Sequence, residues 1–239
     1  MMAGLLKKCR SALLDLLFPP KCAFCGRLLE RPGDVCEACE KDLPYREEGK
    51  ILSAIGEEGF PCAVALYYDG MVRSGVRALK FGKKSWRAGV FARYVAQTAA
   101  EQLGGDFDAV TFVPVSPRRN FQRGFDQARL LAEAAAKTWG VKAEPTLRKV
   151  RHTRAQSSLD DPAARKANVK DVYAALHPEQ IRGRRFLLID DVCTTGSTMA
   201  SAAGALMEAG ADRVVCAALA GGHRKGDKPE PPAEDFGKN

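Results

Sequence analysis

Long apolar runs are absent from this sequence of 239 residues, and so is any recognisable secretory leader. No stretch reaches the ~20 consecutive apolar residues of a membrane-spanning helix, and Lys7, Lys8 and Arg10 interrupt the apolar positions near the N-terminus. We therefore expect a cytoplasmic protein without a transmembrane segment. Residues 3–17 predict an amphipathic helix, which either caps its own domain or lies against the inner face of a membrane.

Two common nucleotide-binding motifs are also missing, and aromatic residues are scarce. The sequence contains neither GxxxxGK followed by Ser or Thr nor GxGxxG, so it predicts neither a P-loop nor a dinucleotide-binding turn. Phe, Trp and Tyr make up 8% of the chain. The chain therefore lacks the aromatic clusters typical of proteins that stack single-stranded nucleic acid, and Phe121 and Phe125 are the best-placed candidates.

Basic residues outnumber acidic ones, which gives a net charge of +8 and a pI of about 9.1. This balance favours anionic partners such as phosphorylated small molecules, nucleic acid or anionic lipid, without choosing among them. The hydrophobic content of 46% is sufficient for a substantial core.

Strand-like and helix-like segments alternate from about residue 63 to residue 222. This order predicts an α/β fold with a parallel sheet and helices on both faces, in which ligands bind outside the carboxyl ends of the strands. The composition divides the chain into an N-terminal helix and cysteine module (1–45), a linker (46–62), the α/β domain (63–222) and a disordered tail (223–239).

Four of the eight cysteines form two closely spaced pairs, Cys22 with Cys25 and Cys36 with Cys39. In a reducing compartment such pairs favour metal binding over disulfides. Four thiolates make a closed tetrahedral site for structural Zn²⁺, and the metal would supply the folding energy of so short a module. A redox pair or an iron–sulfur cluster is the alternative.

The stretch FLLIDDVCTTGSTM (186–199) joins a buried strand to a helix through a turn of small residues. Such a turn lets backbone N–H groups converge on a phosphate at the helix N-terminus. Two carboxylates there are expected to meet sugar hydroxyls or a divalent cation. The pattern resembles the phosphoribosyl-pyrophosphate (PRPP) motif of type I phosphoribosyltransferases. By that resemblance, Asp190 and Asp191 hold the ribose hydroxyls, Mg²⁺ accompanies the pyrophosphate, and the terminal phosphate binds Thr194, Thr195, Gly196, Ser197 and Thr198.

A second basic cluster lies in VPVSPRRNFQRGFDQA (113–128), after another strand. Its clustered guanidinium groups suit a pyrophosphate or polyanion, although a solvated loop with scattered arginines would have the same sequence. The segment 148–171 is polar and basic. It predicts either a mobile loop that closes over a polyphosphate, a segment that follows a nucleic-acid backbone, or a disordered insertion.

Taken together, these segments resemble the ComF/GntX family, the phosphoribosyltransferase-like proteins of competent bacteria. YYDGMVRSGVRALKFGKK (67–84), RHTRAQSSLDDPAARKANV (151–169) and the cysteine module extend the resemblance over most of the chain. It implies a type I phosphoribosyltransferase-like domain with pyrophosphate or loop contacts from Arg118, Arg119, Arg123, Gly124 and Lys80. Asp126 departs from the family, which usually has Asn there, and a carboxylate facing pyrophosphate would weaken binding.

The resemblance implies a ComF-like PRPP-binding protein that acts in competence, DNA uptake and the handling of single-stranded DNA, with DNA-uptake proteins as partners. The alternative is an active phosphoribosyltransferase of nucleotide metabolism, which would transfer phosphoribose from PRPP with Mg²⁺ to an unidentified base or amine. A zinc-module DNA binder with a relic sugar-phosphate site is a third reading. The acceptor and the oligomeric state do not follow from the sequence.

Overall fold

The computed structural model describes residues 19–46, 53–56, 58–82, 84–150 and 172–222. The predicted helix at 3–17, the predicted tail, and residues 151–171 of the basic segment 148–171 lie outside these residues. Within the described ranges, no helix combines the length and the apolar composition that a membrane span requires.

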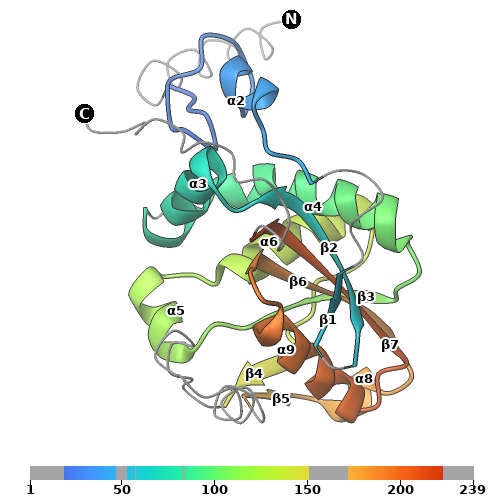
Figure 1. The fold of residues 1–239 in the computed structure, drawn as a ribbon. Helices are drawn as coiled ribbons and strands as arrows, with labels where there is room; N and C mark the ends of the chain where they lie inside the picture. Colours follow the sequence, from blue (N-terminus) through green and yellow to red (C-terminus); the bar gives the residue numbers. More distant parts are fainter. Residues whose placement is uncertain (1–18, 47–52, 57, 83, 151–171, 223–239) are drawn as a thin grey trace, which may run out of the picture.

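A five-stranded sheet with the order β1-β2-β7-β6-β3 forms the centre of the molecule (Figure 1). The pairs β2–β7, β7–β6 and β6–β3 are parallel, and β1 is an antiparallel edge strand. The strands are β1 (Ser53–Ile55), β2 (Phe60–Tyr67), β3 (Ala109–Phe112), β6 (Arg185–Cys193) and β7 (Arg213–Gly221). The predicted α/β fold class is therefore confirmed.

Helices cover both faces of this sheet, each face with its own apolar cluster. On β6, Leu187 and Ile189 belong to one cluster, and Phe186 and Leu188 belong to the other, as the two-residue period of a strand requires. The first face carries α3 (Gly70–Phe81), α4 (Arg87–Leu103) and α6 (Gln127–Ala136), followed by the 3₁₀ turn η1 (Lys137–Trp139). The second face carries α9 (Ser197–Glu208), α8 (Pro178–Ile181) and the two-stranded ribbon of β4 (Leu147–Lys149) and β5 (Tyr173–Ala175).

Three features of the local structure differ from the sequence reading or were not predicted by it. The predicted linker contains β1 and the start of β2, because a three-residue strand among Glu and Gly residues is too short to show a period. The arginine cluster, for which a solvated loop was the alternative reading, forms the helix α5 (Pro117–Arg123). Its signals were present: Ser116 accepts a hydrogen bond from the Arg119 N–H as N-cap, and Gly124 ends the helix with a left-handed φ of 82°. The small ribbon β4–β5 was also missed.

The cysteine module packs directly against α3 and α4 (Figure 1). It includes α2 (Glu37–Lys41). The ring of Phe24 lies 5.1 Å from that of Phe91 on α4, centroid to centroid. A Cβ on Gly75 of α3 would lie 3.1 Å from the carbonyl oxygen of Ala23, so this glycine permits the close approach. The module and the α/β domain therefore share one apolar cluster.

Candidate functional site

Two acidic side chains lie at the carboxyl end of β6, on the rim where α/β sheets bind ligands. The Asp191 side chain is 10% exposed, and its Oδ2 lies 2.9 Å from Nζ of Lys80 at the end of α3. Lys80 was predicted as a pyrophosphate contact. In the free protein it instead neutralises one of the two predicted ribose-binding acids.

Asp190 and Asp191 are consecutive residues of β6, which continues to Cys193. Consecutive side chains of a strand point to opposite faces of the sheet, so the two acids have different surroundings. The charge of Asp190 acts on Lys149 of β4 and Tyr173 of β5, whereas Asp191 pairs with α3. Asp190 Oδ1 accepts a 2.7 Å hydrogen bond from the Asp191 N–H. Burial and then the charge of Asp191 raise the pKa of Asp190 well above its ordinary value, although Lys80 opposes the shift. The acids are thus not an equivalent pair.

The raised pKa of Asp190 gives a testable pH dependence of stability. A carboxyl whose folded-state pKa is raised favours the protonated form, so its ionisation destabilises the fold as pH rises above the unfolded value of about 3.9. We expect Asp190→Asn to have a higher melting temperature than the wild type at pH 7, and the difference to vanish near pH 4. Thermal unfolding followed by circular dichroism between pH 4 and 8 measures this. An equal or lower melting temperature at pH 7 would show that the site stabilises the ionised carboxylate.

The turn between β6 and α9 is built around Gly196, which is buried and has a φ of 77°. A Cβ at this position would lie 2.5 Å from Cγ2 of Ile55 on β1, closer than any real contact. Thr195 Oγ1 and Ser197 Oγ lie 2.9 Å apart across the turn, while Thr194, Thr195 and Thr198 are exposed. The predicted phosphate loop therefore packs against Ile55 through Gly196. Its exposed threonines lie at the N-terminus of α9.

Gly196→Ala is expected to lower the free energy of unfolding by about 2–4 kcal/mol. The left-handed backbone contributes ~1 kcal/mol of this loss and the overlap with Ile55 the rest. Urea unfolding measures the change. Gly183→Ala is the matched control, because Gly183 has a similar φ of 70° and no atom within 4 Å of its added Cβ. If the two variants lose the same stability, Ile55 does not support the turn. Ile55→Ala should recover part of the loss in the Gly196→Ala background.

A pocket of about 400 Å³ adjoins the acids and is lined by Lys80, Phe81, Arg119, Gln122 and Arg123. Three of the five predicted pyrophosphate residues therefore meet in one place. The other two do not: Arg118 is exposed on α5, and Gly124 is the end of that helix. Three cationic side chains around a cavity of this size suit a diphosphate group.

Arg123 is held in position by neighbours on three elements. Its Nη1 donates a 2.7 Å hydrogen bond to Oε1 of the buried Gln127, and its guanidinium lies 5.0 Å from the ring centre of Phe81. Burial lowers the pKa of Arg123, while Asp191 raises it. The hydrogen bond between Arg123 and Gln127 gives a physical reason for the spacing of these two residues in the sequence.

Asp126 does not behave as an added charge aimed at pyrophosphate. Its Oδ2 accepts a 2.9 Å hydrogen bond from the Val115 N–H, and its Oδ1 accepts one of 3.2 Å from the Arg129 N–H, as the N-cap of α6. Both oxygens are therefore used to join the end of β3 to α6. The weaker pyrophosphate binding expected if the Asp126 carboxylate faced the ligand therefore does not apply to this geometry.

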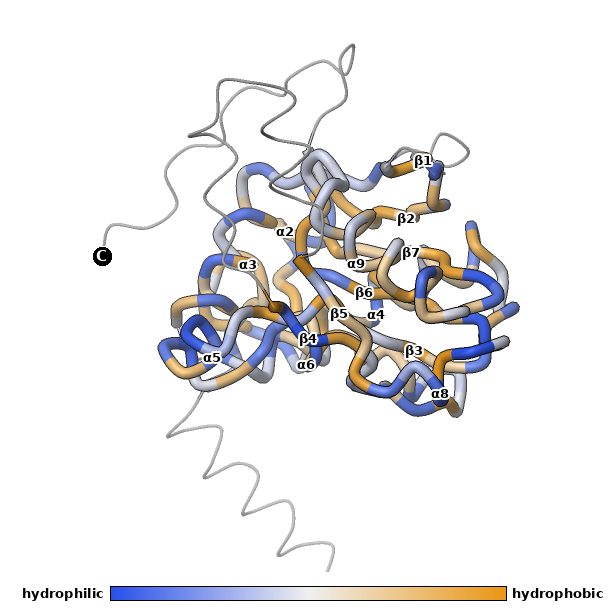
Figure 2. Tube along the Cα trace, turned by 90° about the horizontal axis from the view of Figure 1, so that it is seen from below, coloured by the Kyte–Doolittle hydropathy of each residue, from blue (hydrophilic) through white to orange (hydrophobic). Residues whose placement is uncertain are grey.

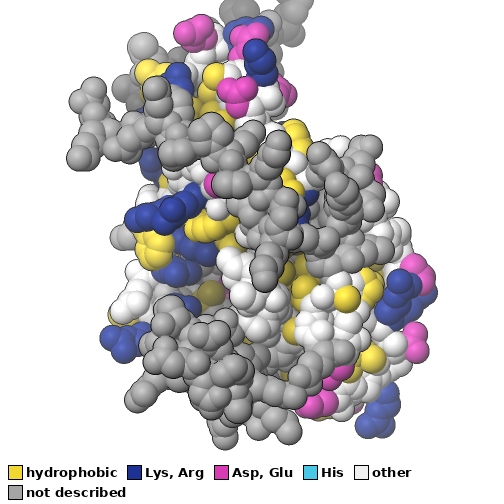
Figure 3. Space-filling view, in the orientation of Figure 1, with side chains coloured by type: hydrophobic (Ala, Val, Ile, Leu, Met, Phe, Trp, Pro, Cys, Tyr) yellow, Lys and Arg dark blue, Asp and Glu magenta, His cyan; other side chains and the backbone are white. Residues whose placement is uncertain are grey.

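A second, more open pocket of about 310 Å³ shares Phe81 with the first, and it is lined by Tyr68, Arg73, Arg77 and Phe81. Figure 3 shows Lys and Arg side chains gathered with hydrophobic ones at the α3 and α5 side of the molecule, and in Figure 2 the α5 segment is largely hydrophilic. Phe81 is 68% exposed and Phe121 is 91% exposed. Phe125 instead packs against the core, so only one of the two predicted stacking residues is available.

Sequence reasoning missed Gln127 and Tyr173 as site residues and assigned Lys149 to a polar loop. Tyr173 is buried, and this burial, followed by the charge of Asp190, raises the pKa of its hydroxyl. Lys149 Nζ lies 5.5 Å from the Tyr173 ring centre, and burial lowers the pKa of this lysine. Short strands carry too few residues for a recognisable pattern, so no sequence signal placed these side chains near the acids.

Cys193, at the end of β6, is buried rather than an exposed loop thiol. Its Sγ lies 3.9 Å from Cys62 Sγ on β2, and the hydrogen bond from Cys62 lowers the pKa of the Cys193 thiol. The residue therefore packs the start of the phosphate loop against the sheet.

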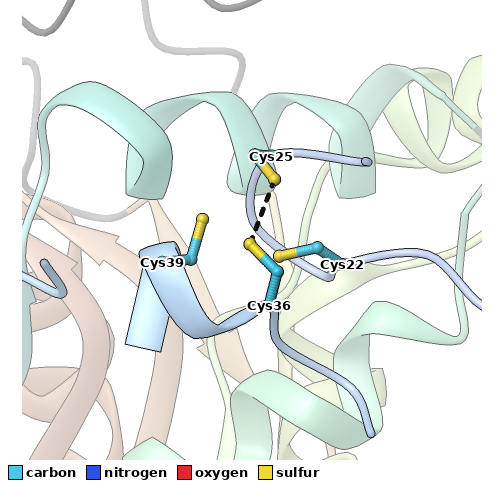
Figure 4. Close-up of side chains that lie close together, drawn as sticks. All are labelled: Cys22, Cys25, Cys36 and Cys39. Atoms are coloured by element: carbon cyan, nitrogen blue, oxygen red, sulfur yellow. Dashed lines mark hydrogen bonds between the residues drawn. The ribbon is translucent and has the colours of Figure 1, made fainter. Parts of the chain in front are cut away.

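The four paired cysteines converge on a single point (Figure 4). Their sulfur atoms all lie within 4.8 Å of one another, and Cys25 Sγ and Cys36 Sγ are 3.7 Å apart. Sulfurs around a tetrahedral Zn²⁺ at ~2.3 Å would be about 3.8 Å apart, so the donor set fits this metal. Cys22 and Cys39 are buried, which suits a closed structural site rather than a catalytic one.

Comparisons with known proteins identify two domains in the chain and several relatives. Residues 13–51 match the double zinc ribbon domain, and residues 128–236 match the phosphoribosyl transferase domain. DNA utilization protein YhgH of Salmonella typhimurium is 30% identical over 199 residues, which cover 81% of this chain and 80% of the relative. Competence protein F of Haemophilus influenzae is 27% identical over 218 residues, 88% of this chain and 87% of the relative. The solved glutamine PRPP amidotransferase of B. subtilis aligns at 23% identity and a TM-score of 0.39, covering 57% of this chain and 26% of the amidotransferase.

Proposed function

Because this chain belongs to the family of DNA utilization protein YhgH and competence protein F, the ComF/GntX family, we propose that its rim binds PRPP and that it acts in the uptake or handling of single-stranded DNA. The zinc ribbon is a structural module of the same protein. DNA-uptake proteins are the partners that this role requires.

The proposed binding mode assigns one part of PRPP to each part of the rim. The turn at Thr194–Thr198 receives the 5-phosphate at the N-terminus of α9. Asp190 and Asp191 face the ribose hydroxyls, and the pocket of Lys80, Arg119 and Arg123 receives the pyrophosphate. Mg²⁺ bound with PRPP would neutralise part of the phosphate charge and would compete with Lys80 for Asp191.

The observation that carries this proposal is the placement of two carboxylates between a turn at a helix N-terminus and an arginine-lined pocket. Isothermal titration of the protein with PRPP and Mg²⁺ tests it, with ribose 5-phosphate and pyrophosphate as partial ligands. Saturable binding of PRPP that exceeds both partial ligands is expected. Absence of heat with PRPP would refute the site. Release of pyrophosphate when PRPP is incubated with the protein and a panel of nucleobases would show that the protein also has transferase activity.

Single-stranded DNA is proposed to bind along the surface of α3 and α5. Arg73 and Arg77 are exposed one helical turn apart and make no ion pair with another described residue. Beside these arginines, the exposed rings of Phe81 and Phe121 continue the path and offer faces on which bases can stack. The path adjoins the PRPP pocket at Phe81, so one ligand can influence the other.

Arg73→Ala/Arg77→Ala is expected to weaken single-stranded DNA binding and to reduce its salt dependence. Each phosphate contact contributes about −0.7 to the slope of log K against log salt concentration for single strands, so the loss of two reduces the slope by about 1.4. Fluorescence anisotropy of a labelled oligo-dT at four salt concentrations measures this. Arg213→Ala, at the start of β7 on the opposite rim, should leave the slope unchanged. An equal change in both variants would place the DNA elsewhere.

A further inference from the structure

The side chain of Arg87, at the first turn of α4, is an unexplained buried cation. The residue is 2% exposed, and its Nε and Nη1 have no hydrogen-bond partner among the residues that the structure describes. Burying a charged group without a partner costs several kcal/mol. Among the described residues no ion pair gives this guanidinium a carboxylate, and the nearby ring of Trp86, 5.4 Å away, compensates only part of the charge.

The groups that face Arg87 belong to the cysteine module. A Cβ on Gly26, next to Cys25, would lie 3.5 Å from Arg87 Nη2, so the guanidinium lies against this turn. Burial lowers the pKa of Arg87, while Cys22 and Cys25 of the module raise it. The guanidinium therefore lies against the turn that carries Cys25, and it comes from a helix of the other domain.

Four thiolates around Zn²⁺ carry a net charge of −2, which is costly in an apolar setting unless a cation or N–H donor compensates it. Cys22, Cys39 and the neighbouring Phe24 are buried, so water cannot supply all of this compensation. We propose that Arg87 is the counter-cation of the zinc-bound tetrathiolate and donates its unused N–H groups to the cysteine sulfurs. The metal site then fixes the module to α4 by charge as well as by apolar packing.

This pairing makes metal binding and domain docking depend on each other. Loading with Zn²⁺ turns the module into an anion that stabilises the buried Arg87, and loss of the metal leaves the guanidinium without its partner. Arg87 is thus a positioning residue of the zinc site. It lies in the α/β domain, outside the cysteine motif and outside the residues matched to the zinc ribbon (13–51).

Zinc competition with a chromogenic chelator tests the proposal on the full-length protein. We expect Arg87→Met to bind Zn²⁺ ~10–100-fold more weakly, as is typical when a partner of the metal ligands is removed. Arg87→Lys, which keeps the charge, should lose less. Arg93→Met is the control: Arg93 lies on the same helix and binds Asp34 of the module at 2.8 Å, but it is exposed and does not contact the cysteines. It should stay within about twofold of the wild type.

A spectroscopic measurement separates charge compensation from simple packing. In the Co²⁺-substituted protein, removing a cation from the sulfurs raises the energy of their lone pairs, so the thiolate-to-metal charge-transfer band should move to lower energy in Arg87→Met and much less in Arg87→Lys. If Arg87→Met does not fold, the position of the same charge-transfer band is compared between the neutral variant Arg87→Gln and the charged variant Arg87→Lys. Unchanged zinc affinity in Arg87→Met, or equal band positions in the neutral and charged variants, would overturn the proposal.

Discussion

Asp190→Asn/Asp191→Asn is expected to lower the affinity for PRPP by at least ~100-fold. Hydrogen bonds to charged groups contribute about 1.5–3 kcal/mol each, and both carboxylates are proposed to accept them from the ribose hydroxyls. Isothermal titration with PRPP and Mg²⁺ measures the loss. Binding that stays within a few-fold of the wild type would remove the acids from the proposed site.

The single variants separate binding from folding, because the two carboxylates have different partners. Asp190→Asn should lose PRPP binding while the fold becomes no less stable, since ionised Asp190 is disfavoured in the free protein. Asp191→Asn should also lose ~3 kcal/mol of stability, because it leaves the largely buried Lys80 without its partner. Lys80→Met added to Asp191→Asn should restore stability without restoring binding. Recovery of PRPP affinity in that double variant would contradict the assignment of Lys80 to the pyrophosphate.

Removal of the metal is expected to unfold the cysteine module and to loosen the helices beneath it. Apparent binding free energies of structural Zn²⁺ in small modules are about 10 kcal/mol or more, far beyond what a segment of this length gains from its own core. Because Phe24 and Leu43 belong to the same apolar cluster as α3 and α4, loss of the module exposes that face. Cys22→Ser should therefore lose zinc and hydrogen-exchange protection in both the module and α4.

Cys216→Ala is the control for this experiment. Cys216 is a buried cysteine of β7 that belongs to the other apolar cluster, so its loss should leave the zinc content at the wild-type level. Hydrogen–deuterium exchange with mass spectrometry and metal analysis by plasma emission measure the two effects. A metal-free wild type with full protection over residues 22–43 would exclude a structural role for zinc.

The parts of the site that could be predicted from sequence are those in which consecutive residues carry the chemistry. The turn at Thr194–Thr198 and the two C-x-x-C pairs are local, so spacing alone brings their functional atoms together. Buried strands such as β6 and β7 could also be predicted, because each contains a run of apolar residues that is long enough to be recognised as a strand. The matches to the double zinc ribbon and phosphoribosyl transferase domains confirmed the predicted zinc module and fold class, while the role of the turn stays a prediction.

By itself the sequence determined the alternation of strands and helices, the two cysteine pairs and the acid pair before a turn of small residues, since each depends on neighbours within a few residues. Only the tertiary structure decided that Lys80 neutralises Asp191, that Gln127 holds Arg123, and that Arg87 lies against the cysteine module. These contacts join residues of different elements, many of them far apart in the chain. Their energies depend on burial and on distances between side chains, which exist only once the elements have packed.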